Sequence, residues 1–269
     1  MIRVELRRLV RSRRTWVTIL MIDALPVLVA VLLAWTDLGP RPGTGPAFLS
    51  AVLTDGKLFP LAALGIVVPL LLPIAVCLMA GETVAGEGQL GTLRYVLIRP
   101  VGRTHLLVAK LVSIVAFAVL AVAVVAATAY VVGLGLLGNA SQAVSSVSGT
   151  TLTGRELALR TLLALAYAIL SMLGVASIAL FLSTVVRSPL AAALGALGLL
   201  VASTLLLTLD AADVLKPWLP TRYWLAFVDL FRDPIHWRDV VRGSLLQLGY
   251  LVVFLGAAWA NFVTKDITD

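Results

Sequence analysis

Residues that could carry out chemistry are scarce in this chain of 269 residues. Its single cysteine, Cys77, lies inside an apolar run, and its two histidines are His105 and His236. One cysteine cannot form a disulfide within the chain, and this set does not match the spacing of a Cys/His metal site. The sequence has no H-E-x-x-H motif and no Ser/His pair suited to nucleophilic catalysis. We therefore predict neither a catalytic residue nor a metal site.

A glycine-rich stretch raises the question of phosphate binding. Residues 86–91, with the sequence GEGQLG, fit the dinucleotide-binding pattern G-x-G-x-x-G. That motif follows a strand in a βαβ unit, whereas an apolar helix is predicted before these residues. The chain contains no G-x-x-x-x-G-K-[ST] pattern. Any work driven by a nucleotide must therefore be supplied by another polypeptide.

The elements that position the remaining polar residues are membrane helices. Hydrophobic residues make up 60% of the chain and charged residues 13%, against about 45–50% and about 25% in a soluble domain. We predict an all-α membrane protein with one transmembrane domain over residues 1–269, because six stretches reach the length of about 20 residues that a crossing needs. Pro69 and Pro73 should kink the second of them. The predicted spans are approximately residues 15–35, 58–80, 106–137, 157–186, 190–209 and 243–262.

Two polar segments flank these spans. Residues 2–14 hold six arginines among apolar residues at near-helical spacing, which predicts a short amphipathic elbow helix on the inner leaflet. A solvated basic terminus is the alternative. Residues 210–242 are too charged to span the membrane, but they are rich in aromatic side chains, which predicts a membrane-interface location. Residues 36–57 and 139–154 are predicted to be loops because they are rich in Gly, Pro, Ser and Thr.

The charge distribution gives an orientation. With the amino terminus inside, the inner segments carry twelve of the 21 Lys and Arg residues and five of the 14 acids, and the outer segments carry nine and eight. The net charges are then +7 inside and +1 outside, in agreement with the positive-inside rule. Topology and anionic membrane lipid account for the basic charge, so we expect no nucleic-acid partner.

Asp23 is predicted to lie near the middle of the first span. An ionised carboxylate there costs about 2.5–3.5 kcal/mol on insertion scales. Asp23 is a possible intramembrane polar site that couples a proton or contacts a substrate, or it is a protonated or hydrogen-bonded residue with no role in transport. The other spans carry almost no ionisable groups, which argues against a pathway for naked ions and favours an amphipathic or lipid-like cargo.

The most informative stretch joins the second and third predicted spans. Leu90, Leu93 and Leu97 recur at i, i+3 and i+7, so they share one side of a short helix. A helix of this length is unstable alone in water, and its apolar side must dock on something. The spacing leaves open whether it docks on the membrane and the chain's own spans or on a cytosolic partner protein.

This stretch resembles the membrane subunits of type-2 ABC transporters, the six-span permeases of bacterial exporters. The resemblance rests on Gly86-Glu87, on residues 91–103 (GTLRYVLIRPVGR) and on residues 106–110 (LLVAK). In that family an acidic residue, Gly-Thr-Leu, a leucine-rich turn, a proline, a basic residue and a lysine occur in this order. Further similarities are the basic elbow, residues 181–189 (FLSTVVRSP) and residues 265–267 (KDI).

The resemblance implies a coupling helix, roughly residues 82–98, that inserts into a groove of a separate ABC-type ATPase subunit. It also implies a second cytoplasmic contact at Arg187 and Ser188, and re-entrant helices on the outer side between Trp218 and Trp237. Small residues in the spans could permit close helix contact: Gly133, Gly135, Gly138, Gly195 and Gly198. The residues implied to couple to the ATPase are Glu82, Glu87, Leu90, Thr92, Leu93, Arg94, Leu97, Arg99 and Arg103.

The function implied is half of the translocation pathway of an ATP-driven exporter in a bacterial inner membrane, with both termini cytoplasmic. Two permeases, identical or homologous, would pair with two ATPase subunits. The chain itself would be no enzyme and would hold no cofactor, because ATP and Mg²⁺ would bind the partner. A stand-alone secondary transporter or channel is the alternative, which an inverted repeat and several intramembrane charges would favour. A membrane-embedded enzyme is a third, which paired intramembrane carboxylates would favour.

Overall fold

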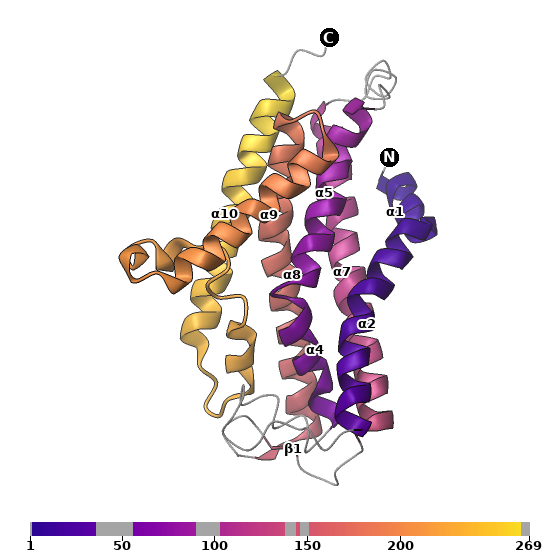
Figure 1. Ribbon diagram of the computed structural model, residues 1–269, viewed down its shortest axis with the longest axis vertical. Helices are drawn as coiled ribbons and strands as arrows, with labels where there is room; N and C mark the ends of the chain where they lie inside the picture. The colour runs from indigo at the N-terminus through magenta and orange to yellow at the C-terminus, as the bar shows by residue number, and fades with distance from the viewer. Residues whose placement is uncertain (1, 36–55, 90–102, 138–143, 146–150, 265–269) are drawn as a thin grey trace.

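A bundle of long apolar helices forms the protein (Figure 1). The structure is a computed structural model that describes residues 2–35, 56–89, 103–137, 144–145 and 151–264. Within these residues, five helices are long and apolar enough to cross a membrane, and a bent pair of helices makes a sixth crossing if it counts as one span. The prediction of an all-α, multi-pass membrane protein is confirmed at this level. The helices are α1 (Ile2–Arg11), α2 (Arg13–Trp35), α4 (Phe59–Val67), α5 (Leu71–Gln89), α7 (Arg103–Leu136), α8 (Gly154–Val185), α9 (Pro189–Thr208) and α10 (Trp237–Thr264).

Short elements complete the chain. Three-residue 3₁₀ turns are η1 (Gly56–Leu58), η2 (Asp210–Ala212) and η3 (Lys216–Trp218), and η4 (Ala226–Phe231) is longer. The predicted loop over residues 139–154 contains a small antiparallel pair, β1 (Val144–Ser145) and β2 (Thr151–Leu152). Thr153 then caps α8 in a capping box with Glu156, which explains why the helix begins at Gly154.

Two helices extend beyond the predicted spans. α10 begins at Trp237 rather than at residue 243, because Asp239 in its first turn suits the positive end of the helix dipole. α5 continues through Gly81 to Gln89, although the sequence predicts a polar connection from Gly81 onward. No proline interrupts residues 81–89, and Gly81 packs against the start of α9, so neighbouring helices support the extra turns.

The second crossing is broken, as the prolines predict. α4 and α5 meet at an angle of 58° across residues 68–70. Pro69 lacks the N–H that the Gly65 carbonyl would accept, and Pro73 lacks the one that the Pro69 carbonyl would accept. Pro73 itself lies in the first turn of α5, where a missing N–H disturbs nothing. Helix formation therefore stops before Pro69 and restarts at Leu71, between the two prolines.

The break allows the two halves of this crossing to pack in different places. α4 packs mainly against α7 and α2, whereas α5 packs mainly against α8 and α9. We call α1, α2, α4 and α7 the α7 group, and α5, α8, α9 and α10 the α8 group. The two groups also touch each other, chiefly where α7 packs on α8. The broken crossing thus runs from one packing group into the other.

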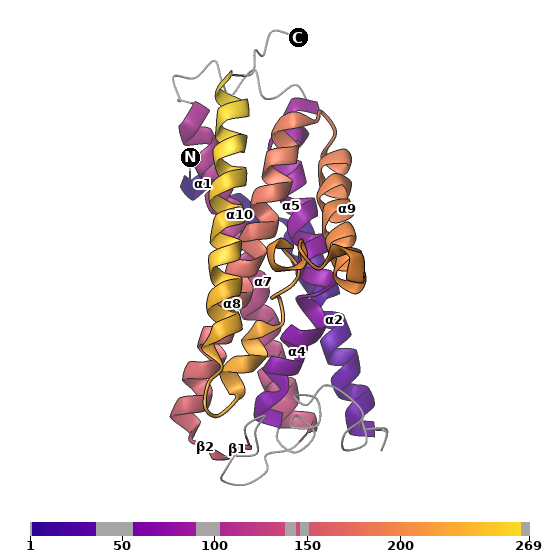
Figure 2. The ribbon, with the colours of Figure 1, turned by 90° about the vertical axis from the view of Figure 1, so that its left-hand side faces the viewer.

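The chain between α9 and α10 continues along the bundle from the end of α9 to the start of α10 (Figure 2). α9 has 20 residues and α8 has 32, so at 1.5 Å per residue α9 is about 18 Å shorter. Figure 2 shows that α9 ends near the middle of the bundle, and that η2 to η4 lead from there to the start of α10. This irregular segment, residues 209–236, lies beside α8 and α10.

Side chains from α8 and α10 bind the carbonyls of this irregular segment. The Tyr167 hydroxyl donates to the Tyr223 carbonyl at 2.6 Å, and Gln247 Nε2 donates to the Pro220 carbonyl at 2.7 Å. Arg160 Nη1 donates to the carbonyls of Leu230 and Arg232 at 3.2 and 2.9 Å. The Tyr250 hydroxyl donates to the Trp218 carbonyl at 2.9 Å. Non-helical backbone at membrane depth needs such partners, because lipid offers none.

The aromatic residues of this segment divide into two sets. Trp218 and Trp237 are exposed, in keeping with the predicted membrane interface. The other four aromatics singled out from the sequence, Tyr223, Trp224, Phe227 and Phe231, are buried in the core. The interface prediction is wrong for these four, because composition does not reveal that η4 folds against α8 and α10.

Close helix packing depends on glycines that the sequence does not single out. A Cβ at Gly174 would overlap the Gln247 side chain, and a Cβ at Gly243 would overlap Tyr167 and Tyr223. Of the predicted glycines, Gly133 is as tightly packed, against Gly56 and Phe59. Gly195 lies against Leu182, Gly135 and Gly198 have open space where a Cβ would be, and Gly138 lies outside the described residues.

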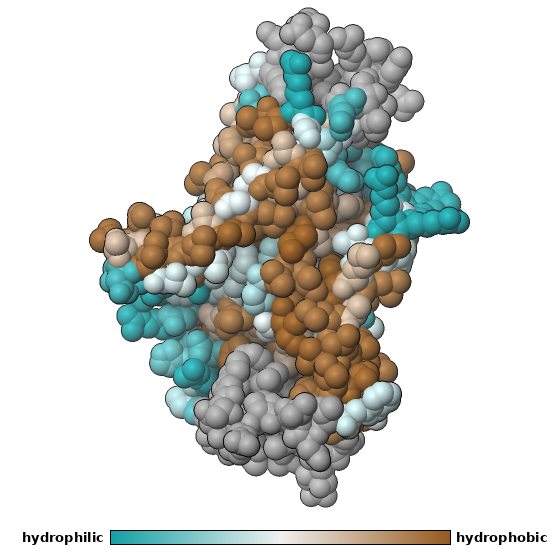
Figure 3. Space-filling model, viewed as in Figure 1, coloured by the Kyte–Doolittle hydropathy of each residue, from teal (hydrophilic) through white to brown (hydrophobic). Residues whose placement is uncertain are grey.

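The outside of the bundle is apolar along most of its length. Figure 3 shows hydrophobic side chains over the middle of the molecule and polar ones near α1 and below the protruding residues that follow α9. Exposed apolar residues include Leu20 and Leu28 on α2, Leu194 and Leu205 on α9, and Val252 on α10. Such a surface suits lipid acyl chains.

Replacing Gly243 by alanine tests the packing of α10 on α8. We expect Gly243→Ala to lower stability by about 1–3 kcal/mol, because the added methyl group overlaps two tyrosine side chains. Gly256→Ala on the same helix is the matched control, since its Cβ would meet nothing within 4 Å. Thermal unfolding in detergent, followed by tryptophan fluorescence, measures both. Equal unfolding temperatures for the two variants would contradict this packing.

Candidate functional site

The residues implied to contact an ATPase divide into described and undescribed ones. Arg103 begins α7, Glu82 and Glu87 lie in the last turns of α5, and Arg187 and Ser188 connect α8 to α9. The side chains of Glu87 and Arg103 are outside the described part of the structure. The remaining predicted coupling residues also lie outside the described residues: Leu90, Thr92, Leu93, Arg94, Leu97 and Arg99. The expected separate coupling helix over residues 82–98 is therefore untested, although its first eight residues continue α5.

The end of α5 adjoins the connection between α8 and α9. A Cβ at Gly81 would come within 2.9 Å of the Pro189 carbonyl oxygen, and one at Gly86 within 3.8 Å of the Pro189 ring. Ser188 caps α9 by accepting a hydrogen bond from the Ala191 N–H at 3.4 Å, with Pro189 in the first turn. The two segments implied to face a partner are therefore neighbours in space, although about 100 residues separate them in the sequence.

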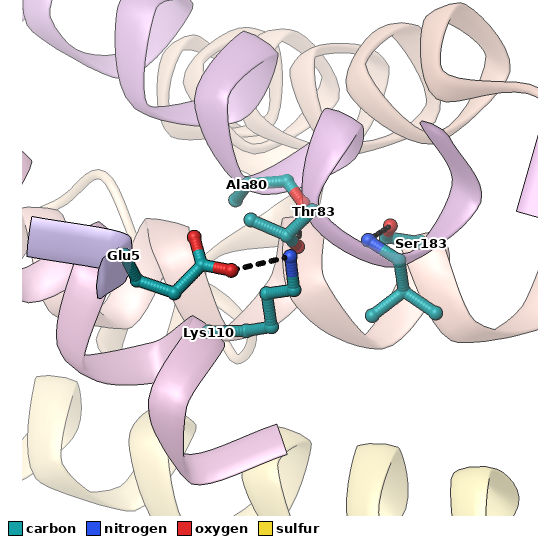
Figure 4. A network of polar contacts seen from close by, with 6 residues as sticks. Glu5, Ala80, Thr83, Lys110 and Ser183 are labelled. Atoms are coloured by element: carbon teal, nitrogen blue, oxygen red, sulfur yellow. Dashed lines mark hydrogen bonds and ion pairs between the residues drawn. The ribbon is translucent and has the colours of Figure 1, made fainter. Parts of the chain in front are cut away.

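Helix α1 lies at the same end of the bundle and contacts α7 (Figure 1). Its Glu5 carboxylate lies 3.2 Å from the Lys110 ammonium (Figure 4). The Lys110 side chain is only 6% exposed and that of Glu5 is 23% exposed. This partly buried ion pair joins α1 to α7. The sequence contained a weak signal for it, since Glu5 is the only acid among residues 2–14.

A second ion pair connects the start of α2 to the end of α5. Arg14 Nη1 lies 3.9 Å from a Glu82 carboxylate oxygen, and both side chains are exposed. Exposed pairs of this length contribute about 0–1 kcal/mol. Glu82 therefore stays accessible to another molecule.

The end of α10 completes this face of the molecule. Trp259 Nε1 donates to the Thr104 hydroxyl of α7 at 3.1 Å, and Asn261 Nδ2 donates to the Thr184 hydroxyl of α8 at 3.0 Å. Side-chain contacts at one end of the bundle thus involve six of the described helices: α1, α2, α5, α7, α8 and α10. We call this the α1 end; it includes both the amino-terminal helix and Thr264 (Figure 1).

Asp23 is not part of this end. It is buried in the middle of α2, where the Thr128 hydroxyl of α7 lies 2.6 Å from its Oδ1 atom. The same hydroxyl lies 2.9 Å from the Val124 carbonyl oxygen of its own helix. Of the two interpretations that the sequence left open, the structure shows the hydrogen bond to a neighbouring helix. Its role in transport is not tested by this contact.

Metal binding has no support in the described residues, since no three His, Cys, Asp or Glu side chains come together there. The polar side chains of the α1 end bind one another, neighbouring backbone or solvent. What the arrangement offers is a rigid polar face that a protein partner could bind.

The Glu5–Lys110 pair predicts an asymmetry between two variants. Glu5→Gln removes the carboxylate that faces a buried ammonium, and we expect a loss of about 3 kcal/mol in stability. Lys110→Met removes the more deeply buried charge itself and leaves a carboxylate that water can reach, so the loss should be smaller. Thermal unfolding of the two single variants and the double variant in detergent measures both effects. A larger loss for Lys110→Met than for Glu5→Gln would contradict the assignment.

Comparison with known proteins gives a family but no activity. A search of curated proteins found no match. The sequence profile of one family matches residues 47–268, which is most of the chain and includes every spanning helix except α2. The chain belongs to that family, which is described as "Protein of unknown function (DUF2705)".

Proposed function

We propose that the chain is the membrane subunit of an ATP-driven exporter of the type-2 ABC class. It forms half of a translocation pathway for an amphipathic, lipid-like or drug-like cargo. A separate ATPase subunit binds its α1 end and hydrolyses ATP with Mg²⁺, and a second copy or a homologue of the chain completes the pathway. The protein lies in a bacterial inner membrane with both termini in the cytoplasm.

The observation that carries the proposal is the adjacency of the two segments that resemble ATPase contacts. The last turns of α5, which hold Glu82, lie against the connection that holds Arg187 and Ser188. Two segments far apart in the sequence thus form one polar face, as a single docking partner requires. Within the sequence there is no phosphate-binding loop that would let the chain use ATP by itself.

The orientation is supported by the shape of the bundle. The α1 end contains α1, the end of α5, the start of α7, the α8–α9 connection and the end of α10 (Figure 1). These are the segments that the charge count assigns to the inner side. The irregular segment of residues 209–236 starts near mid-bundle and continues away from the α1 end, which fits the re-entrant outer segment that the resemblance implies.

The mechanism follows from the connections of the α1 end. ATP-driven closure of two ATPase subunits would draw the two α1 ends of a permease pair together, and the helices would carry the movement to the cargo pathway. No bond is made or broken by the chain itself in this scheme. A stand-alone secondary transporter would instead need its own coupling group, and Asp23 is the intramembrane candidate that the sequence offers.

The direct test uses the chain with and without an ATPase. We expect the purified chain alone to hydrolyse no ATP, and to co-purify with the soluble P-loop ATPase encoded beside it. ATP hydrolysis by that ATPase should increase when the chain is present in proteoliposomes. Proton-coupled transport by the chain alone, without ATP, would instead support a secondary transporter.

Charge reversal tests the docking face. Glu82→Arg or Glu87→Arg should abolish stimulation of the ATPase while leaving the unfolding temperature unchanged, because Glu82 is exposed and its pair with Arg14 is weak. Arg155→Glu is the matched control, since Arg155 is an exposed residue at the start of α8, at the opposite end of the bundle. ATPase assays of the complexes in nanodiscs measure the effect. Wild-type stimulation by the glutamate variants, or equal loss in the control, would contradict the docking face.

A further inference from the structure

The Ser183 hydroxyl of α8 is bonded to the backbone of α5. Its oxygen donates to the Gly81 carbonyl at 2.8 Å and accepts from the N–H groups of Ala85 at 2.9 Å and Val84 at 3.2 Å. Gly81 and Ala85 are separated by four residues, so their carbonyl and N–H are the pair that an α-helical hydrogen bond joins. A buried hydroxyl from another helix therefore binds both members of one backbone hydrogen-bonded pair of α5.

The preceding backbone pair of α5, the Ala80 carbonyl and the Val84 N–H, also has side-chain partners. The Thr83 hydroxyl donates to the Ala80 carbonyl at 2.6 Å, and the Val84 N–H, which would pair with that carbonyl, is one of those bonded to Ser183. Two successive backbone pairs of α5 thus share their hydrogen bonds with hydroxyl groups. Hydroxyls that enter the ladder in this way bend helices and fix the direction of the bend.

Gly81 brings the same turn of α5 into close contact with the start of α9. A Cβ there would lie 2.9 Å from the Pro189 carbonyl oxygen and 3.1 Å from the Ala193 nitrogen. The turn from Ala80 to Ala85 is therefore held by α8 through Ser183 and by the start of α9 through close contact. Beyond this turn, the described part of α5 continues to Gln89.

We propose that Ser183 is a positioning residue that sets the direction in which the last turns of α5 leave the bundle. This inference rests on the proposed function, because those turns carry Glu82 and Glu87 and lead into the segment implied to bind the ATPase. Ser183 need not touch the partner. Its hydroxyl keeps the end of α5 in register with the α8–α9 connection, so that both segments move as one body when the partner moves.

The chemistry of the contact makes a specific prediction for Ser183→Ala. When the hydroxyl is removed, the Gly81 carbonyl and the Ala85 N–H still have each other as α-helical partners. The link from α8 to α5 is then lost without leaving a buried polar group unsatisfied. The variant should therefore change the direction of the helix end and leave the fold stable.

Ser171 provides a matched control on the same helix. It is as fully buried as Ser183, but its hydroxyl donates to the Tyr167 carbonyl of α8 itself, at 3.0 Å. Ser171→Ala removes the same atoms from the same helix without touching α5. Any effect that comes only from losing a buried hydroxyl should appear in both variants.

A distance measurement tests the inference without the ATPase. Spin labels at Gln89→Cys and Arg187→Cys, both exposed, are introduced into a Cys77→Ala background, which contains no other cysteine. A change of about 20° acting over roughly 8 Å from the hydroxyl contact to Gln89 would move the label by about 3 Å. Double electron–electron resonance should show a shift of this order for Ser183→Ala and none for Ser171→Ala. An unchanged distance in Ser183→Ala, or an equal shift in the control, overturns the inference.

A second arm uses the ATPase complex. Ser183→Ala should still co-purify with the ATPase but lose most of the stimulation of ATP hydrolysis, whereas Ser171→Ala should retain both. Failure of the wild-type chain to form a complex would contradict the proposed function, and the label distances would still show whether Ser183 orients α5. Normal stimulation by a Ser183→Ala complex would overturn the positioning role while leaving the proposed function in place.

Discussion

The structure depends on one constraint: backbone N–H and C=O groups buried in a lipid-facing bundle must find partners within the protein. Helices meet this requirement internally, which is why most of the described chain is helical. Where the chain departs from a helix, side chains supply the missing hydrogen bonds. Arg160, Tyr167, Gln247 and Tyr250 bind carbonyls of the irregular segment between α9 and α10. These four polar side chains are therefore explained by backbone that is not helical.

This constraint also explains why Arg160 is buried. The sequence presents it as a charged residue near the start of a span, and a basic residue in such a position often marks a ligand or ion pathway. In the fold its guanidinium is buried against two backbone carbonyls of the segment that follows Phe227. A guanidinium has five N–H donors, which suits it to holding irregular backbone together. The structural role is sufficient to account for its burial.

The sequence predicted what depends on local chemistry and missed what depends on packing. Apolar length predicted the five helices that are long enough to cross a membrane and the bent pair α4–α5, and Pro69 and Pro73 predicted the break within that pair. The extension of α5 past Gly81 was not predicted, because it rests on Ser183 and Pro189, which lie about 100 residues away. The tight contacts at Gly174 and Gly243 were missed for the same reason, since which glycine faces another helix is not encoded in the glycine itself. Of the candidate site, the sequence predicted the segments, and the structure adds that two of them are neighbours.

The segment between α5 and α7 connects the two packing groups. α5 belongs to the α8 group through Ser183, Gly81 and its packing on α8 and α9, whereas α7 belongs with α1, α2 and α4. Residues 90–102 join these two helices in the sequence. The two groups are also linked covalently through residues 68–70, between α4 and α5. This link is described in full, and the crossing bends by 58° there. A partner that binds the segment between α5 and α7 would therefore pull on both groups at once. The broken crossing can accommodate their relative movement, because Pro69 and Pro73 each lack the N–H of a helical hydrogen bond. The contacts between α1 and α7 and between Ser183 and α5 would then keep each group rigid while the two groups move.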